Sequence, residues 1–190
     1  MARLFARLTR LPAGLHALAL VLALGGAVWL ARMVDALYVA SGHPASHASG
    51  QLAFSAARIE VYFAVMQSAG TLERYAASQR LDLGLIVAIA LVVLLAGSFA
   101  ARLGGPGSRG WQAGLAAAWL GLAGAGMDVA ENLASFAMLA PPVSIPQALA
   151  LAYSSFAAAK FALLALALLA LLAAVLIGAV ERLAGAYRPR

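Results

Sequence analysis

The chain contains no cysteine and few charged side chains. The absence of cysteine excludes disulfides, thiolate metal sites, cysteine nucleophiles and iron–sulfur clusters. Charged residues make up 11% of the 190 residues, whereas soluble proteins contain about 25%. Apolar residues make up 64%, above the roughly 45–50% of soluble domains. This composition excludes a soluble globular domain and a disordered chain, and it predicts an integral membrane protein in a lipid bilayer.

Short catalytic and nucleotide-binding motifs are also absent. The sequence has no G-x-S-x-G, H-E-x-x-H or P-loop pattern. His43 and His47 have the spacing H-x3-H, but Pro44 and the small residues around them predict a loop. No carboxylate in this loop completes a ligand set, so we expect no metal site. The sequence therefore leaves any cofactor and any catalytic residue unknown.

Four long apolar runs predict four membrane-spanning helices. A spanning helix needs about 20 apolar residues, and an open strand cannot satisfy its backbone in lipid. The expected spans are residues 15–40, 81–101, 111–139 and 147–180. The breaks between them contain glycine and proline, including Pro141, Pro142 and Pro146. The predicted fold is an all-α four-helix bundle that forms a single membrane domain over residues 1–190.

Residues 51–80 form an additional segment before the second span. Leu52–Ser68 reads as one amphipathic helix that lies on the membrane surface or caps the bundle. A peripheral helix that fills space and a lid over the outer end of the bundle both remain open. We expect Thr71 to cap the next helix, which runs through Arg80 into the second span.

Basic residues gather on one predicted face of the membrane. Lysine and arginine accumulate in short cytoplasmic loops. On this face Glu181 alone opposes the basic residues Arg3, Arg7, Arg10, Arg102, Arg109, Arg182, Arg188 and Arg190. We therefore expect both termini in the cytoplasm. The net charge of +6 then reflects topology and contact with anionic lipid, and we expect no nucleic-acid partner.

Polar side chains within the predicted spans are the strongest functional signal. Asp128, Glu131 and Asn132 share one helical face because they are spaced i, i+3 and i+4. The last two spans form an antiparallel hairpin that sets Asp128 level with Lys160, its expected partner. Ionisable groups in a span are a functional hypothesis by default, although a buried pair can also serve only to fix helix register.

Further polar residues are expected to converge on the outer half of the same bundle. The acids of the hairpin outnumber its lysine. We therefore expect one acid to be protonated, paired with an arginine or exposed to water. The remaining residues of the expected polar site are Arg32, Asp35, Arg58, Asp82 and Ser155.

Three short motifs resemble those of small, largely uncharacterised four-span bacterial membrane proteins. They are Leu81-Asp82-Leu83 at the start of the second span, Asp128-Val129-Ala130-Glu131-Asn132 in the third, and Lys160 in the fourth. The likeness covers residues 51–178. It implies the inner membrane of a bacterium and supports treating the polar residues as a group, but it carries over no activity.

Three classes of function fit these observations. The first is a protein that binds or transports a small molecule, ion or lipid from the outer face, with Asp128, Glu131 and Lys160 as polar contacts. The second is a membrane-embedded acid/base enzyme acting on a lipid or isoprenoid. The third is an accessory or scaffold subunit. Stripes of small residues, such as Gly110, Gly114 and Ala118, favour tight packing within the chain or a homo-oligomer.

The charge pattern yields a test of orientation. Because the chain has no cysteine, Ser49→Cys and Ser108→Cys introduce unique labelling sites. With an impermeant thiol reagent added to intact cells, Ser49→Cys should react and Ser108→Cys should not, since the basic loop is expected in the cytoplasm. Outside labelling of Ser108→Cys alone would contradict the orientation.

Overall fold

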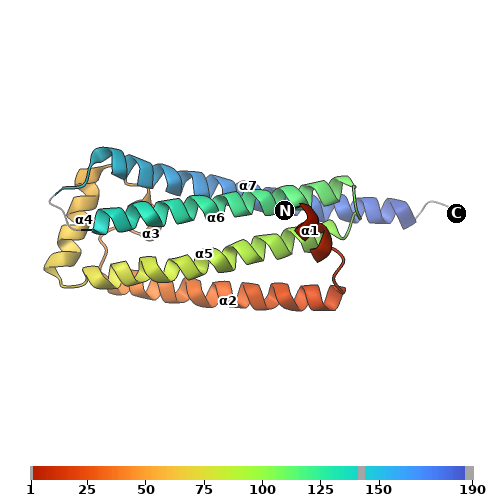
Figure 1. Cartoon of the computed structure of the whole chain (residues 1–190), viewed down its shortest axis with the longest axis horizontal. Coiled ribbons are helices and arrows are strands. Elements are labelled where there is room, and N and C mark those ends of the chain that lie inside the picture. Colours follow the sequence, from red (N-terminus) through yellow and green to blue (C-terminus); the bar gives the residue numbers. More distant parts are fainter. Residues whose placement is uncertain (1, 141–143, 187–190) are drawn as a thin grey trace. The chain divides into compact units, whose positions relative to one another are not determined.

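Four long helices dominate the chain in the computed structural model, which describes residues 2–140 and 144–186. The helices are α1 (Ala2–Leu8), α2 (Ala13–Ala40), α3 (His47–Gln51), α4 (Ala56–Ser68), α5 (Leu72–Ala101), α6 (Arg109–Leu139) and α7 (Gln147–Ala186) (Figure 1). Within the described residues there is no strand. α2, α5, α6 and α7 are long and apolar enough to cross a membrane. The predicted all-α, four-span fold is therefore confirmed.

The helices differ from the predicted segments at their ends. α5 begins at Leu72, so residues 72–80 belong to the second long helix, as the run from Thr71 through Arg80 predicted. α7 continues to Ala186, and the short helix α1 was not predicted. Four residues used in the sequence argument lie outside the described ranges: Pro141, Pro142, Arg188 and Arg190.

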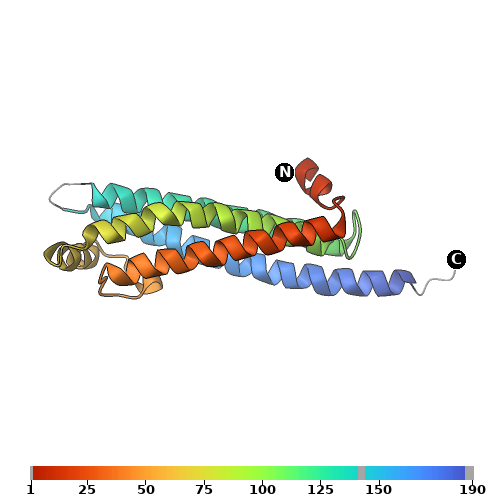
Figure 2. The ribbon, with the colours of Figure 1, turned by 90° about the horizontal axis from the view of Figure 1, so that it is seen from below.

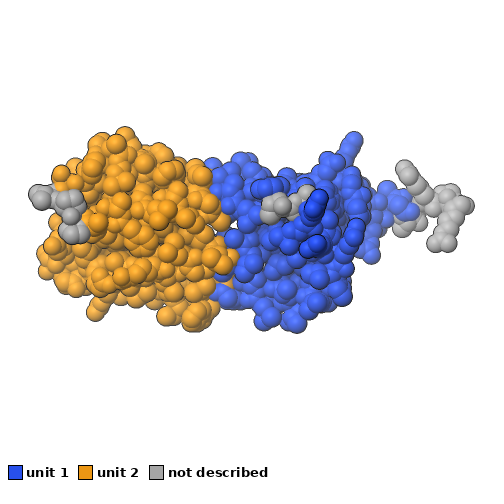
Figure 3. Space-filling view, viewed as in Figure 1, with its two compact units in different colours: residues 1–26, 88–124, 162–190 blue, residues 27–87, 125–161 orange. Residues whose placement is uncertain are grey.

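The chain divides into two compact units, and each of the four long helices contributes to both. Unit 1 comprises Met1–Gly26, Ala88–Gly124 and Ala162–Arg190, and unit 2 comprises Ala27–Val87 and Ala125–Phe161 (Figure 3). Unit 1 includes α1 and the turn between α5 and α6. Unit 2 includes α3 and α4, and it holds the polar residues of the predicted site.

Small residues bring α5, α6 and α7 into close contact within unit 1. A Cβ atom built on Gly97 would lie 2.6 Å from the carbonyl oxygen of Gly114. One built on Gly110 would lie 2.8 Å from Cα of Gly178. Helices approach this closely only where the side chains between them are small. The predicted stripe Gly110, Gly114 and Ala118 therefore packs within the chain, and Ala118 is fully buried.

A carboxylate from α7 caps the first turn of α6. Glu181 Oε1 accepts a hydrogen bond from Arg109 N at 3.0 Å, and Oε2 accepts one from Gly110 N at 3.1 Å. The first N–H groups of a helix lack partners within the helix and attract negative charge. Gly105 and Gly107 form the preceding turn with φ of 82° and 81°, which glycine adopts readily. Glu181 thus joins two helices.

In unit 2, α4 lies across the ends of α6 and α7 (Figures 1 and 2). Its side chain Ile59 is 3% exposed and packs in one core with Met138 of α6 and Tyr153 of α7. Met66, at the other end of α4, is fully buried against Tyr75 of α5. Of the two placements expected for this amphipathic helix, the structure therefore has the one that caps the helix ends.

The predicted single helix Leu52–Ser68 is wrong in its first residues. Phe54 has φ of 51°, which a helix does not allow. Its N–H donates to Ser154 Oγ at 3.0 Å, and its carbonyl accepts from Gln147 Nε2 at 3.1 Å. Because α7 side chains satisfy this backbone, the helix begins only at Ala56.

Two details of the neighbouring loops also differ from the sequence interpretation. Residues 47–51 of the predicted small-residue loop form the short helix α3, capped by Ser46. Thr71 directly precedes α5, but its hydroxyl does not cap this helix. It donates instead to the carbonyl oxygens of Ser41, at 2.6 Å, and Met66, at 3.2 Å. This hydroxyl therefore ties the start of α5 to the end of α2.

The close contact at Gly97 yields a prediction on stability. Gly97→Ala should destabilise the protein by about 1–3 kcal/mol, the usual effect of overpacking, because its methyl group would meet the backbone of α6. Thermal unfolding of the purified protein in detergent measures this. Gly126→Ala is the matched control, since a Cβ on this helical glycine meets nothing within 4 Å. Equal melting temperatures for the two variants would contradict the contact.

Candidate functional site

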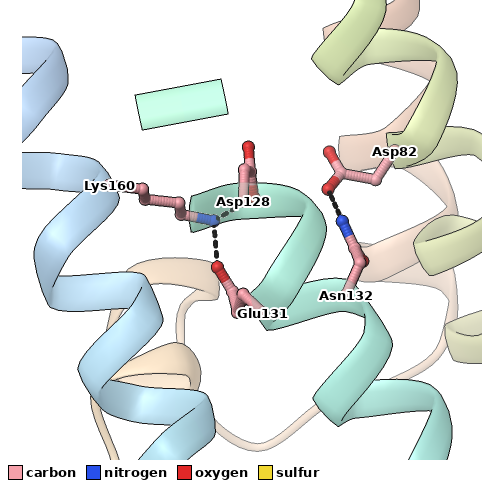
Figure 4. Close-up of polar contacts among 5 residues, drawn as sticks. All are labelled: Asp82, Asp128, Glu131, Asn132 and Lys160. Atoms are coloured by element: carbon pink, nitrogen blue, oxygen red, sulfur yellow. Dashed lines mark hydrogen bonds and ion pairs between the residues drawn. The ribbon is translucent and has the colours of Figure 1, made fainter. Parts of the chain in front are cut away.

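Five polar side chains from three helices form a buried network in unit 2 (Figure 4). Their exposed fractions are 8% for Asp82 on α5, 7%, 1% and 1% for Asp128, Glu131 and Asn132 on α6, and 5% for Lys160 on α7. The three α6 residues are presented together because positions i, i+3 and i+4 share one face of a helix. One face of α6 therefore meets polar partners on both of its neighbours.

Lys160 lies between two carboxylates. Its Nζ is 2.7 Å from Asp128 Oδ1 and also forms an ion pair with Glu131 Oε2. On the other side of α6, Asn132 Nδ2 donates to Asp82 Oδ2 at 2.7 Å. The ion pairs thus join α6 to α7, and the amide–carboxylate hydrogen bond joins α6 to α5.

The carboxylates of the network outnumber its cations. The network holds three carboxylates, of Asp82, Asp128 and Glu131, and one ammonium, that of Lys160. Within the described residues no arginine forms an ion pair with any of these acids. A fully ionised network would hold two negative charges that nothing neutralises. Buried charge is costly unless it is paired. A bound proton, a cation or a ligand would offset this excess.

Several buried oxygen atoms beside the network have no hydrogen-bond partner in the part of the chain that the structure describes. They are Asn132 Oδ1, Gln79 Oε1 and Ser135 Oγ. Glu131 Oε2, in contrast, is paired with the Lys160 ammonium. Buried polar atoms are nearly always hydrogen-bonded, so these acceptors are chemically suited to a donor or a cation.

The structure does not bring four of the expected residues to the network. Arg32, Asp35, Arg58 and Ser155 all have exposed side chains. The buried face of α7 follows a spacing of three and four residues through Ala150, Tyr153, Ser154, Ala157 and Lys160. Ser155 falls outside this face, and its neighbour Ser154 is the buried serine.

The same argument applies to the other three residues. The buried face of α2 passes through Val34 and Tyr38, which leaves the intervening Asp35 and the preceding Arg32 on the exposed side. Arg58 precedes the buried Ile59 on α4 and is likewise turned outward. Of the three alternatives expected for the excess acid, pairing with an arginine is not seen among the described residues, and both acids of the hairpin contact Lys160.

Aromatic rings and α3 lie next to the network. The His47 ring stacks on Tyr38 at a centroid distance of 4.4 Å, and the His43 ring stacks on the same tyrosine at 4.9 Å. Burial lowers the pKa of both histidines, and the Lys160 ammonium lowers the pKa of His47 further. His47 is therefore within electrostatic reach of the network. These histidines are packed groups and not solvated loop residues.

A separate cavity of about 370 Å³ lies at the end of unit 2 that α4 covers. Its walls come from α4, the start of α5 and the end of α6, and its polar residues include Glu60 and Gln67. The five network residues do not line it. In the described ranges, no group of three or more His, Asp or Glu side chains is placed to hold a metal ion. The network itself is buried, and none of its five residues is more than 8% exposed.

Comparison of the chain with protein-family models, with curated proteins and with solved structures gave no match. The resemblance to four-span bacterial membrane proteins therefore rests on the short motifs alone. Any function has to be inferred from the chemistry of the network and of the groups that cover it.

Sequence reasoning missed Gln79 and Ser135. Both are buried, with exposed fractions of 2% and 0%. Their spacing offered a signal, because Gln79 precedes Asp82 by three residues and Ser135 follows Asn132 by three. A search for uncharged polar residues on the same helical face as each acidic residue would have found them.

The shared lysine generates a prediction about coupling. Lys160→Met should destabilise the protein by about 3–5 kcal/mol, the usual result of removing one partner from a buried ion pair, because two carboxylates lose their cation. Asp128→Asn should be milder, since Glu131 still faces the ammonium. Thermal unfolding in detergent compares the variants.

Adding Asp128→Asn and Glu131→Gln to Lys160→Met should restore much of the lost stability. In that triple variant neither an ammonium nor these two carboxylates remain buried and unpaired, and replacing a whole buried ion cluster is often neutral. If the losses of stability in the single variants simply add up in the triple variant, the coupling of Lys160 to the two carboxylates is rejected.

Proposed function

We propose that this multi-pass membrane protein binds, or carries across the membrane, a small polar molecule, an ion or the polar head of a lipid. Asp128, Glu131 and Lys160 are its polar contacts. The observation that carries the proposal is the sharing of one buried ammonium by two carboxylates. A purely structural pair needs one acid for one lysine, and a second acid adds a cost of burial.

The three side chains offer complementary chemistry to a ligand. An ammonium has three N–H donors, and in the described part of the chain its acceptors are Asp128 and Glu131. The third donor suits a ligand oxygen, while the carboxylate oxygens suit a ligand N–H, O–H or cation. In a low-dielectric site, hydrogen bonds of this kind discriminate strongly because an unmatched group is costly. The network favours a ligand that both donates and accepts hydrogen bonds.

We further propose that the segment from His43 to Ser68 is the cover of this site. Its short helix α3 brings His47 within the electrostatic influence of Lys160, and its helix α4 packs on the ends of α6 and α7. Because Glu131 is only 1% exposed, a ligand can reach it only when a covering element moves. On this proposal the segment acts as a lid over the site.

The proposed setting is the inner membrane of a bacterium, with both termini in the cytoplasm and the cover outside. The excess of basic residues around the turn between α5 and α6 and near the termini supports this orientation. The short-motif resemblance supports the bacterial assignment. In this setting the ligand enters from the outer face.

Glu131→Gln tests the function. It preserves the shape of the side chain and leaves Lys160 paired with Asp128, so the variant should fold and elute as a single species. Purified wild-type protein in lipid nanodiscs is screened with amino acids, organic amines, carboxylates and phospholipid headgroups. One of these four classes should bind and raise the melting temperature. Glu131→Gln should lose at least about tenfold in apparent affinity, the equivalent of one contact of about 1.4 kcal/mol.

Ser155→Ala is the matched control, because this α7 side chain is exposed and should leave the shift unchanged. If no probe class shifts the wild-type melting temperature, and Glu131→Gln melts as the wild type does, the binding proposal fails. The network would then be part of a scaffold.

A further inference from the structure

Several buried oxygens on the facing sides of α5 and α6 in unit 2 have no hydrogen-bond partner among the described residues. Asp82 and Asn132 are joined by a single hydrogen bond in which the amide N–H is the donor. The amide oxygen of Asn132 has no partner among the described residues, and neither have Gln79 Oε1 and Ser135 Oγ. These three side chains are at most 2% exposed. The proposed function uses none of these atoms.

Helix geometry places Gln79 and Ser135 at the same level. α5 and α6 run in opposite directions (Figures 1 and 2), and Asp82 touches Asn132. Gln79 lies three residues before Asp82 and Ser135 three residues after Asn132, so both lie about one turn farther along in the same direction. Both are buried on the faces that carry the Asp82–Asn132 pair.

By this helix register, the four side chains bring oxygen atoms of low total charge to the contact between α5 and α6. The set consists of one carboxylate, two amide oxygens and one hydroxyl, and it offers neither nitrogen nor sulfur as a ligand. Oxygen ligands suit hard cations. Ca²⁺ takes about six to eight oxygens, commonly with several carboxylates, and Mg²⁺ demands near-octahedral geometry. A single carboxylate with three neutral oxygens matches a monovalent cation more closely.

We propose that Asp82, Asn132, Gln79 and Ser135 bind a monovalent cation, Na⁺, between α5 and α6. The ion neutralises the charge of Asp82, which Lys160 does not contact. It also provides a partner for the three acceptor oxygens. This site is distinct from the Asp128–Glu131–Lys160 contacts of the proposed function. A bound ion here holds α5 against the same face of α6 that carries those contacts.

Purified protein in nanodiscs tests the site without knowledge of any other ligand. Its melting temperature should rise saturably with NaCl relative to choline chloride at equal ionic strength, because a ligand that binds only the folded state stabilises it. KCl should act more weakly. Ser135→Ala and Gln79→Met each remove one oxygen and should weaken the apparent Na⁺ affinity about tenfold. Asp82→Asn should abolish the Na⁺ effect.

Ser78→Ala is the matched control. Ser78 is as buried as Ser135, but its hydroxyl donates to Tyr75 O at 2.7 Å within the same helix. This variant should keep the full response to Na⁺. Glu131→Gln should keep it too, so loss of the proposed ligand binding and loss of the Na⁺ site are separate results.

Three outcomes would overturn the proposal. A rise that is equal in NaCl, KCl and choline chloride reflects ionic strength only. A melting temperature that is insensitive to Na⁺ from pH 5 to pH 9 means that water or a proton satisfies these oxygens. An unchanged Na⁺ response in Ser135→Ala and Gln79→Met places any bound ion elsewhere.

Discussion

The ammonium of Lys160, held between Asp128 and Glu131, governs the arrangement of the polar residues in unit 2. A lysine within an apolar helix has few ways to avoid a large cost of burial, and a carboxylate on a neighbouring helix is the most direct. Once α7 is fixed against this face of α6, Asn132 is turned toward α5. It reaches Asp82 there, so the positions of three helices depend on one cation.

The two units rely on different kinds of contact. In unit 1, glycine and alanine allow backbones to touch, as at Gly97 and Gly114, and the polar exception is Glu181 at the start of α6. In unit 2, ion pairs and hydrogen bonds connect the helices. Such contacts add little net stability beyond an apolar core of the same shape. The need to pack the helices does not by itself explain their presence in unit 2.

Hydropathy predicted the four spans because length and apolar composition alone determine whether a helix can cross lipid. The same-face spacing of Asp128, Glu131 and Asn132 required only the helical period. Sequence could not give the rotation of each helix about its axis, because neighbouring helices determine it. For this reason Arg32 and Ser155 were expected at the site but are exposed. The start of α4 was missed because α7 side chains satisfy the backbone at Phe54.

The balance of charges distinguishes a binding site from an architectural ion pair. An architectural pair is complete in itself, and its groups satisfy one another. Here the network holds three carboxylates and one ammonium, which contacts two of them. Buried oxygens of Asn132, Gln79 and Ser135 also lack hydrogen-bond partners among the described residues. Each such group raises the free energy of the folded chain until a donor or cation arrives. On the binding function proposed above, the occupied site would be more stable than the empty one, and this would couple the fold of unit 2 to its ligand.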